Sequence, residues 1–297
     1  MHTPEHLVIR PPSEARSLLV RVVRGCDWNR CSFCGIYDLF GTPYSTRSKE
    51  EVLMDIDALA SLHGDIFTTA FLGDANPLDL PAQFLVDVLE RLREKFPRLT
   101  RVTAYARASS LAKKTGDDLL AIREAGLDRV HVGLESGSNR VLKLQMKGTS
   151  HKQLVEAGKK TMASGLELSY YFLLGLGGQD LWEEHALESA AVFTGVKPHF
   201  IRVRRLFIHP MSKLAGKIAA GEFREQTPEG TVHELKTLIA ALDAEGTTFT
   251  CDHANNYLPV HGLLNRDRQA LLDVIDSFLA LPEDRRTAHY RSVPSVI

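Results

Sequence analysis

The 297-residue sequence lacks a long hydrophobic run and an excess of charge of either sign. No stretch approaches the roughly 18 apolar residues that a membrane-spanning helix needs. Residues 1–17 carry Glu5, Glu14, Pro11 and Pro12 and do not resemble a signal peptide. The formal net charge is -1, so a basic surface for nucleic acid or anionic lipid is not expected. These absences predict no membrane and no nucleic-acid partner, and they favour a small molecule as the partner.

Cysteine is also scarce, with four residues in all, three of which lie within nine positions at Cys26, Cys31 and Cys34. This distribution is not the disulfide framework of a secreted protein, so a cytoplasmic location is predicted. Three clustered thiols instead indicate a metal or iron–sulfur site, because zinc and iron–sulfur clusters both prefer thiolate ligands. Structural zinc usually takes four protein ligands, and no histidine lies in this segment. Zinc or a disulfide clip remains the alternative to a cluster.

The chain up to about residue 210 alternates between β-rich runs and helical patterns. Ser48 with Glu51, and Thr115 with Asp118, predict helix starts. Strands are expected over 18–23, 66–72, 102–105, 128–134, 166–174 and 199–207. Beyond them, helical patterns near 211–220, 228–244 and 266–281 surround a short run over 247–251.

Six strands alternating with helices are the pattern of parallel βα units, two units short of a closed eight-fold barrel. The predicted fold is therefore α/β, a partial (β/α)6 barrel of the TIM type with a mainly helical C-terminal extension. The predicted organisation is an N-terminal arm over 1–15, the barrel over 16–210, and an extension over 211–297 that covers the barrel.

Several motif-like loops directly follow the predicted strands. In barrels of parallel strands the chemistry lies at the C-terminal strand ends. The loops in question hold the cysteine segment, Gly73-Asp74, Arg107, Glu135-Ser136 and Gly175-Leu176-Gly177-Gly178. Their common position predicts that they share one rim of the sheet.

The cysteine segment together with these loops resembles the radical S-adenosylmethionine (radical SAM) superfamily. Members hold a [4Fe-4S] cluster on a cysteine loop after the first barrel strand, with Cys-x3-Cys-x2-Cys as the commonest spacing, where this chain has Cys-x4-Cys-x2-Cys. The stretch Gly133-Leu134-Glu135-Ser136-Gly137-Ser138 resembles the branch of the oxygen-independent coproporphyrinogen oxidases and the methylthiotransferases. The resemblance covers about 16–210 and implies that Cys26, Cys31 and Cys34 bind the cluster, whose open iron chelates S-adenosylmethionine.

The resemblance also implies cofactor-binding roles, each with a plainer structural alternative. Gly73 and Asp74 take the place of a turn that binds the cofactor ammonium, or they form an ordinary strand-to-helix turn. Arg107 would pair with the methionyl carboxylate, or it is a surface arginine. Glu135 would contact the ribose or amino acid part, or it is a rim carboxylate exposed to water. Phe33 would pack near the adenine, or it is a buried loop aromatic. The other implied cofactor contacts are Ser136 and Gly175, the latter close to the adenine, with Ser138 as a helix cap.

The substrate side is indicated by a second group of residues. Arg202 and Arg204 share one face of a strand and hold an anionic substrate if that face looks into the barrel, or pair with helix carboxylates if it looks out. Of Tyr170 and Tyr171, one is expected to face the cavity and the other to pack against a helix. Cys251 is either a small buried hydrophobe, or a hydrogen-atom donor or a ligand in the substrate cavity.

The implied activity is that of an enzyme that cleaves S-adenosylmethionine reductively. The resulting 5′-deoxyadenosyl radical abstracts hydrogen from a small polar or anionic substrate, and an external one-electron donor such as a flavodoxin or ferredoxin supplies the electron. Oxidoreductase, lyase and isomerase outcomes remain open. The alternatives are a non-catalytic iron–sulfur redox or sensor protein and a zinc-stabilised binding protein.

Overall fold

The computed structural model describes residues 8–294, so residues 1–7 of the predicted N-terminal arm lie outside it. The described chain divides into two compact units. The first consists of residues up to 29 with 36–132 and 159–168, and the second consists of 30–35, 133–158 and 169 onward. The predicted boundaries at 15 and 210 stay a prediction. Within 8–294, no helix is long and apolar enough to cross a membrane.

One eight-stranded sheet runs through the fold in the order β1-β4-β5-β6-β7-β8-β9-β10. The register is parallel for the neighbouring strands from β1 to β6 and from β7 to β9, and it is antiparallel for β9 with β10. This arrangement confirms the predicted α/β fold. The strands are β1 (Leu18–Arg21), β4 (Thr69–Gly73), β5 (Arg101–Ala106), β6 (Arg129–Glu135), β7 (Glu167–Leu174), β8 (Phe200–Arg205), β9 (Thr248–Thr250) and β10 (His261–Leu263).

Two features of the strands differ from the sequence prediction. The first predicted strand stops at Arg21, and Val23–Arg24 (β2) pairs instead with Ser45–Thr46 (β3) in an antiparallel ribbon. The C-terminal extension adds β9 and β10 to the sheet. Each is three residues long, too short for an alternating hydrophobic pattern to reveal it.

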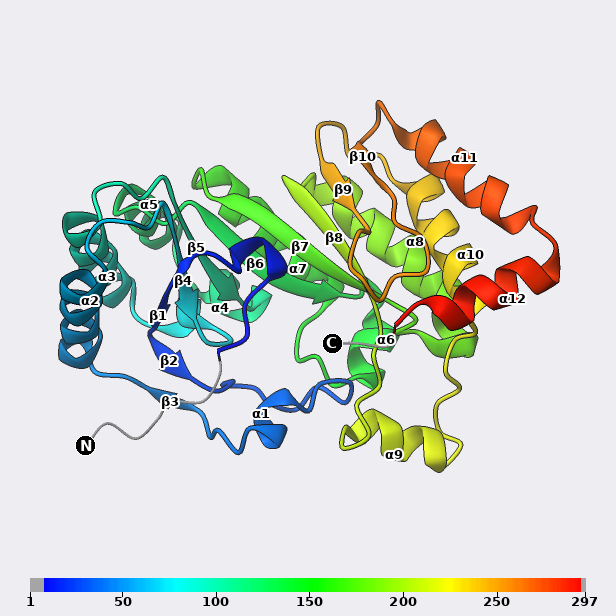
Figure 1. Ribbon diagram of the computed structural model, residues 1–297, viewed down its shortest axis with the longest axis horizontal. Coiled ribbons are helices and arrows are strands. Elements are labelled where there is room, and N and C mark those ends of the chain that lie inside the picture. The colour runs from blue at the N-terminus through cyan, green and yellow to red at the C-terminus, as the bar shows by residue number, and fades with distance from the viewer. Residues whose placement is uncertain (1–7, 295–297) are drawn as a thin grey trace. The chain divides into compact units, whose positions relative to one another are not determined.

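Helices of the first unit start where their capping residues predict. Ser48 and Glu51 form a capping box at α2, and Thr115 and Asp118 form another at α5. α2 and α3 lie side by side (Figure 1), and α3 buries one apolar face. These helices are α1 (Ile36–Leu39), α2 (Lys49–His63), α3 (Ala82–Lys95), α4 (Ala108–Lys113) and α5 (Gly116–Glu124), with 3₁₀ turns at Pro12–Glu14 and Pro77–Asp79.

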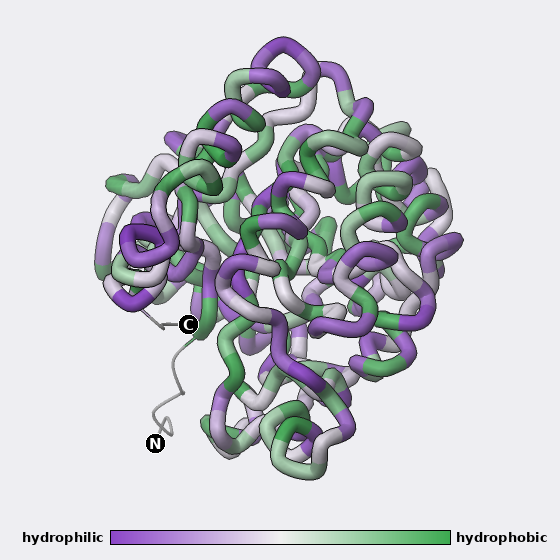
Figure 2. The backbone as a smooth tube through the Cα atoms, turned by 90° about the vertical axis from the view of Figure 1, so that its right-hand side faces the viewer, coloured by the Kyte–Doolittle hydropathy of each residue, from purple (hydrophilic) through white to green (hydrophobic). Residues whose placement is uncertain are grey.

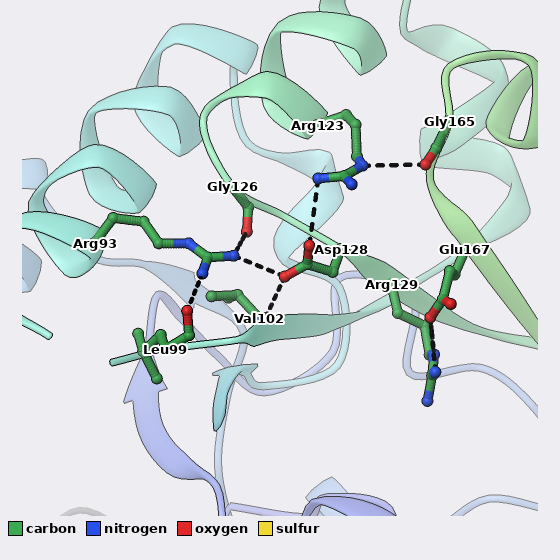
Figure 3. Close-up of polar contacts among 9 residues, drawn as sticks. All are labelled: Arg93, Leu99, Val102, Arg123, Gly126, Asp128, Arg129, Gly165 and Glu167. Atoms are coloured by element: carbon green, nitrogen blue, oxygen red, sulfur yellow. Dashed lines mark hydrogen bonds and ion pairs between the residues drawn. The ribbon is translucent and has the colours of Figure 1, made fainter. Parts of the chain in front are cut away.

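Polar contacts tie the first unit together at the N-terminal strand ends (Figure 3). Asp128 Oδ2 accepts hydrogen bonds from Arg93 Nη2 and from the Val102 amide, both at 2.7 Å. Its Oδ1 accepts from Arg123 Nη1 at 3.3 Å, and Arg93 also donates to the Gly126 carbonyl at 2.6 Å. This network joins α3 and α5 to β5, and it lies at the strand ends opposite the motif-bearing loops.

The second unit packs helices on one face of β7 and β8. Tyr170 and Phe172 of β7 are fully buried, and both rings contact Phe193 of α8. Figure 2 shows hydrophobic and hydrophilic residues following one another along the helical turns, as amphipathic helices require. The helices are α6 (Asn139–Leu144), α7 (His151–Ala163), which ends in the first unit, α8 (Gly178–Val196), α9 (Lys213–Ala219), α10 (Pro228–Ala241), α11 (Arg268–Leu279) and α12 (Glu283–Ser292).

Candidate cofactor site

The cysteine segment begins at a glycine that the backbone requires. Gly25 has φ +70°, and a Cβ there would lie 2.9 Å from the Thr42 carbonyl oxygen. Its amide donates to Asp74 Oδ2 at 3.0 Å, while Asp74 Oδ1 accepts from Arg21 Nε at 3.2 Å. Asp74 is 1 % exposed. The Asp74 carboxylate therefore fixes the start of the cysteine segment from within the first unit, a contact that the sequence prediction did not include.

Cys26 follows in the first unit and accepts an N–H hydrogen bond on sulfur. The Asn29 amide lies 3.4 Å from Cys26 Sγ. Hydrogen bonds to cysteine sulfur are one of the means by which proteins tune iron–sulfur clusters. Cys26, Cys31 and Cys34 are each partly buried thiols, and among the described residues no cysteine forms a disulfide. The disulfide-clip alternative is therefore not supported, and the donor type fits a cluster.

Arg107, at the end of β5, is bound to the cysteine segment rather than to solvent. Its Nη1 lies 2.8 Å from Asp27 Oδ2, and its guanidinium lies 4.9 Å from the Trp28 ring centroid. Asn76 donates to Asp27 Oδ1 at 3.0 Å and accepts from the Arg107 amide at 3.0 Å. The Arg107 side chain is 16 % exposed, so it is not the surface arginine of the alternative reading. A contact with the methionyl carboxylate stays a prediction.

In the second unit, Gln145 holds the remaining cysteine turn. The Cys34 amide donates to the Cys31 carbonyl at 3.2 Å, and the Ser32 amide between them donates to the Gln145 carbonyl at 3.0 Å. The Gln145 side chain bonds the Ser32 hydroxyl and donates to the Leu176 carbonyl at 3.0 Å. The fully buried Gln145 thus links the cysteine turn to the glycine turn after β7.

Glu135 forms a partly buried ion pair with Lys147 at 3.1 Å. Lys147 Nζ also lies 5.8 Å from the Phe33 ring centroid, so the predicted aromatic and the predicted carboxylate share one neighbour. Gly133 leaves room for the pair, since a Cβ there would lie 2.8 Å from Lys147 Nζ. Glu135 has φ +60°, a left-handed conformation that costs a non-glycine residue about 1–3 kcal/mol and that clusters at functional sites.

Lys147 and Gln145 are two candidate site residues that sequence reasoning missed. Both follow the short helix α6, beyond the Glu135-Ser136 loop, in a turn where Met146 has φ +50° and Gly148 has φ +71°. The sequence indicates a turn after α6, but a turn does not identify either residue as a cofactor ligand.

The other residues predicted in these loops, Ser136, Ser138 and Gly175, form hydrogen bonds within the protein. The Ser136 side chain is fully buried and bonds His185 Nδ1 at 2.8 Å. Ser138 accepts the Val141 amide at 3.2 Å, which confirms it as the cap of α6. Gly175 has φ +85°, and its amide donates to Glu234 Oε1 at 2.9 Å.

Arg202 and Arg204 lie on the face of β8 opposite the buried Ile201 and Val203. Arg202 Nε donates to Ser169 Oγ at 3.1 Å, and the Arg204 guanidinium lies 5.9 Å from the Tyr171 ring centroid. Within 8–294, neither arginine forms an ion pair with a carboxylate. The alternative in which helix carboxylates neutralise them is therefore not supported.

Tyr170, Tyr171 and Cys251 complete the predicted residues. The Tyr170 hydroxyl is buried and donates to the Leu154 carbonyl of α7 at 2.6 Å, which confirms that one tyrosine packs against a helix. Tyr171 lies on the opposite face, beside Arg202 in the register. Cys251 is fully buried, and burial raises the pKa of its thiol. This environment supports the small buried hydrophobe and gives no support to a hydrogen-atom donor.

The described residues hold no group of three or more His, Cys, Asp or Glu side chains already arranged around one point as for a metal ion. Cys26 belongs to the first unit, whereas Cys31 and Cys34 belong to the second. The three thiols stay a predicted ligand set on their chemical type and their spacing in the sequence.

Comparison with curated proteins finds partial relatives. A 4′-phospho-dehydrooxetanocin synthase of Priestia megaterium is 29% identical over an alignment of 174 residues, and the match covers 53% of this chain and 23% of the relative. A tRNA-2-methylthio-N(6)-dimethylallyladenosine synthase of Syntrophobacter fumaroxidans is 26% identical over an alignment of 211 residues, and the match covers 66% of this chain and 43% of the relative. The chain therefore spans less than half the length of these relatives.

Among solved structures, coproporphyrinogen III oxidase from Escherichia coli, described as a radical SAM enzyme, matches with a TM-score of 0.56 and 16% identity. The match covers 76% of this chain and 53% of that chain, and it shows likeness of fold alone. A family model described as the radical SAM superfamily matches residues 20–190. Because that match spans more than half of the 297 residues, the chain belongs to the radical SAM superfamily, whose cofactors are a [4Fe-4S] cluster and S-adenosylmethionine.

Proposed function

We propose that the chain is an enzyme in which Cys26, Cys31 and Cys34 hold the cluster and which acts on a small polar or anionic substrate. When bound, the cluster and S-adenosylmethionine supply a 5′-deoxyadenosyl radical that abstracts hydrogen, with the electron coming from an external donor such as a flavodoxin or ferredoxin. The observation that carries the proposal is the partly buried thiol set of the cysteine segment, with an amide directed at Cys26 sulfur.

The residues around the cysteines have the task of holding the segment in place. Asp74 and Arg107 fix its first half, and Gln145 fixes its second half through Ser32. Positioning of this kind, together with exclusion of water, is what a protein contributes to cofactor chemistry.

Glu135 and Lys147 are proposed to bind the amino acid part of S-adenosylmethionine. That part is a zwitterion, with an ammonium and a carboxylate on one carbon. A carboxylate and an ammonium 3.1 Å apart, both largely withdrawn from solvent, offer it one partner of each sign. Lys147 would take the carboxylate and Glu135 the ammonium or the ribose hydroxyls.

The decisive experiment is anaerobic reconstitution with iron and sulfide, followed by dithionite and S-adenosylmethionine. We expect 5′-deoxyadenosine from the wild type and none from the variant with Cys26→Ala, Cys31→Ala and Cys34→Ala together. A wild type that binds one tightly held zinc and has no visible charge-transfer absorption would support the zinc-stabilised binding protein instead.

Replacing Lys147 by methionine is expected to raise the KM for S-adenosylmethionine by roughly 10- to 100-fold, because a hydrogen bond to a charged group contributes about 1.5–3 kcal/mol. Lys147→Arg keeps the charge and should recover most of the affinity. The matched control is Lys143→Met, at an exposed position of α6. An unchanged KM in the methionine variant, with iron content intact, would rule out the proposed contact.

Arg202 and Arg204 are proposed to bind the anionic group of the substrate. The two guanidiniums are partly buried, have no carboxylate partner in the described chain, and lie on the sheet face away from α8. Burial of a cation without a counter-charge is costly, so an anionic ligand is the natural complement.

A panel of small carboxylates and phosphate monoesters tests this assignment through their stimulation of S-adenosylmethionine cleavage. Arg202→Gln with Arg204→Gln should raise the concentration for half-maximal stimulation by roughly 10-fold or more, since each charged hydrogen bond is worth about 1.5–3 kcal/mol. Arg224→Gln, at an exposed ion pair with Asp180, is the control. Equal stimulation in the double variant would contradict the assignment.

A further inference from the structure

A fully buried histidine and a fully buried glutamate connect two of the loops in the second unit. His185 lies on α8 and Glu234 on α10, and neither side chain has measurable exposure. Their helices pack against each other. Burying two ionisable groups is costly unless they are hydrogen-bonded, so their contacts need a physical reason.

His185 reaches the loop after β6 through one ring nitrogen. Its Nδ1 lies 2.8 Å from Ser136 Oγ, and its Nε2 lies 3.1 Å from the Leu173 carbonyl and 3.4 Å from Glu234 Oε1. Because a carbonyl oxygen only accepts, Nε2 carries the proton, and Nδ1 accepts the Ser136 hydroxyl proton. Burial lowers the pKa of His185 to about 4, which agrees with a neutral ring.

Glu234 reaches the glycine turn after β7. Its Oε1 accepts the Gly175 amide at 2.9 Å, and its Oε2 is buried with no hydrogen-bond partner in the described part of the chain. Burial raises the pKa of Glu234 to about 8, so the group is mostly a neutral acid at pH 7. A protonated carboxyl can still accept the hydrogen bond from the Gly175 amide. Because it is neutral, it places no charge in the low-dielectric interior.

The loop after β6 has a backbone that needs external support. Glu135 directly before Ser136 has φ +60°, whereas the φ of +85° at Gly175 is one that glycine adopts without strain. Left-handed conformations of a non-glycine residue persist only when the surrounding contacts over-determine them. Ser189 of α8, one turn after His185, adds a hydrogen bond of 2.7 Å from the Gly137 amide. The α8 helix therefore holds the β6 loop at two points, and α10 holds the β7 turn at one.

We infer that His185, through Ser136, and Glu234, through Gly175, are positioning residues that set the Glu135 loop and the Gly175 turn for S-adenosylmethionine. The inference rests on the proposed function for the identity of the ligand. The helix α10 belongs to the C-terminal extension, so the extension takes part in shaping the cofactor site.

The test compares Glu234→Leu, Glu234→Gln and Thr231→Val in the reconstituted full chain. Thr231 is the matched control, because it is buried on α10 and its hydroxyl donates to the carbonyl of Thr227, the N-cap of the same helix. Amide exchange is measured on peptides covering 133–138 and 173–178, together with iron content and the KM and kcat for S-adenosylmethionine cleavage.

We expect Glu234→Leu to speed exchange in 173–178 and to raise the KM roughly tenfold, the size of one lost hydrogen bond to a buried group. Glu234→Gln keeps an acceptor for Gly175 and should stay within about threefold of the wild type, because the amide mimics the neutral acid. Thr231→Val should change neither quantity. A folded Glu234→Leu variant with unchanged exchange and unchanged KM overturns the inference.

Ser136→Ala provides an independent arm, since it removes a single hydroxyl and does not depend on the leucine variant folding. It should speed exchange in 133–138 and leave 173–178 unchanged. Unchanged exchange in 133–138 overturns the role of His185. If the wild type binds no S-adenosylmethionine, the proposed function fails, while the exchange measurements still decide whether these side chains position the loops.

Discussion

Replacing any one of Cys26, Cys31 and Cys34 by alanine is expected to abolish 5′-deoxyadenosine formation and to remove most of the bound iron. Iron–sulfur clusters are held by cysteine thiolates, and a set of three has no spare ligand. Alanine offers no donor atom, and no histidine lies in the segment between Gly25 and Gly35 to substitute. Iron and acid-labile sulfide per chain, with the visible absorption of the reconstituted protein, measure the effect directly.

Cys251→Ala is the matched control for this series. Cys251 is fully buried, and its raised thiol pKa disfavours the thiolate that a metal needs. The variant should therefore retain its iron and its cleavage activity. Full iron content in the Cys26→Ala protein would show that the first cysteine is not a ligand. Loss of iron from the Cys251→Ala protein would place the cluster elsewhere.

The features that the sequence predicted well depend on local patterns. The capping boxes at Ser48 and Thr115 and the helix cap at Ser138 each involve residues within one helical turn. The burial of Tyr170 and the partial exposure of Tyr171 follow from the two-residue period of a strand. Such features can be predicted from the sequence because the residues concerned are close neighbours along the chain.

The features that the sequence did not predict depend on residues brought together by folding. Asp74 could be placed after a strand, but its pairing with Arg21 depends on the packing of β1 against β4. Likewise Arg107 finds Asp27, a residue inside the four-residue spacer between the first two cysteines. The spacer thus supplies a counter-charge for the end of β5.

Contacts between residues distant in the chain are also what the sequence fails to predict for Gln145, His185 and Glu234. Each is a polar residue on or beside a helix, and in the sequence each looks like part of a solvated face. All three are fully buried, and each bonds a loop that lies at least 30 positions away along the chain. Only the packing of α6, α8 and α10 against the strand ends makes them part of the site.

Glu234→Gln is expected to stabilise the protein relative to the wild type by an amount that grows as pH rises from about 4.5 to about 8. The Glu234 pKa is raised from 4.5 to about 8 in the folded chain, so between these values the folded protein keeps a proton that the unfolded chain releases. Wild-type stability therefore falls with rising pH across this window, by at most about 1.4 kcal/mol per pH unit. Glutamine does not titrate in this range, so the stability of the Glu234→Gln variant does not fall with pH for this reason.

Denaturant unfolding of both proteins between pH 5 and pH 9 measures the difference. His185, whose pKa is lowered by burial to about 4, contributes an opposite slope below about pH 6.5. The histidine is present in both proteins, so its term largely cancels in the difference. Glu222→Gln, at an exposed carboxylate of the same unit, controls for the loss of a charge without burial. A difference between Glu234→Gln and wild type that stays constant with pH would mean that Glu234 is ionised in the folded protein, and its bond to Gly175 would then be that of a carboxylate.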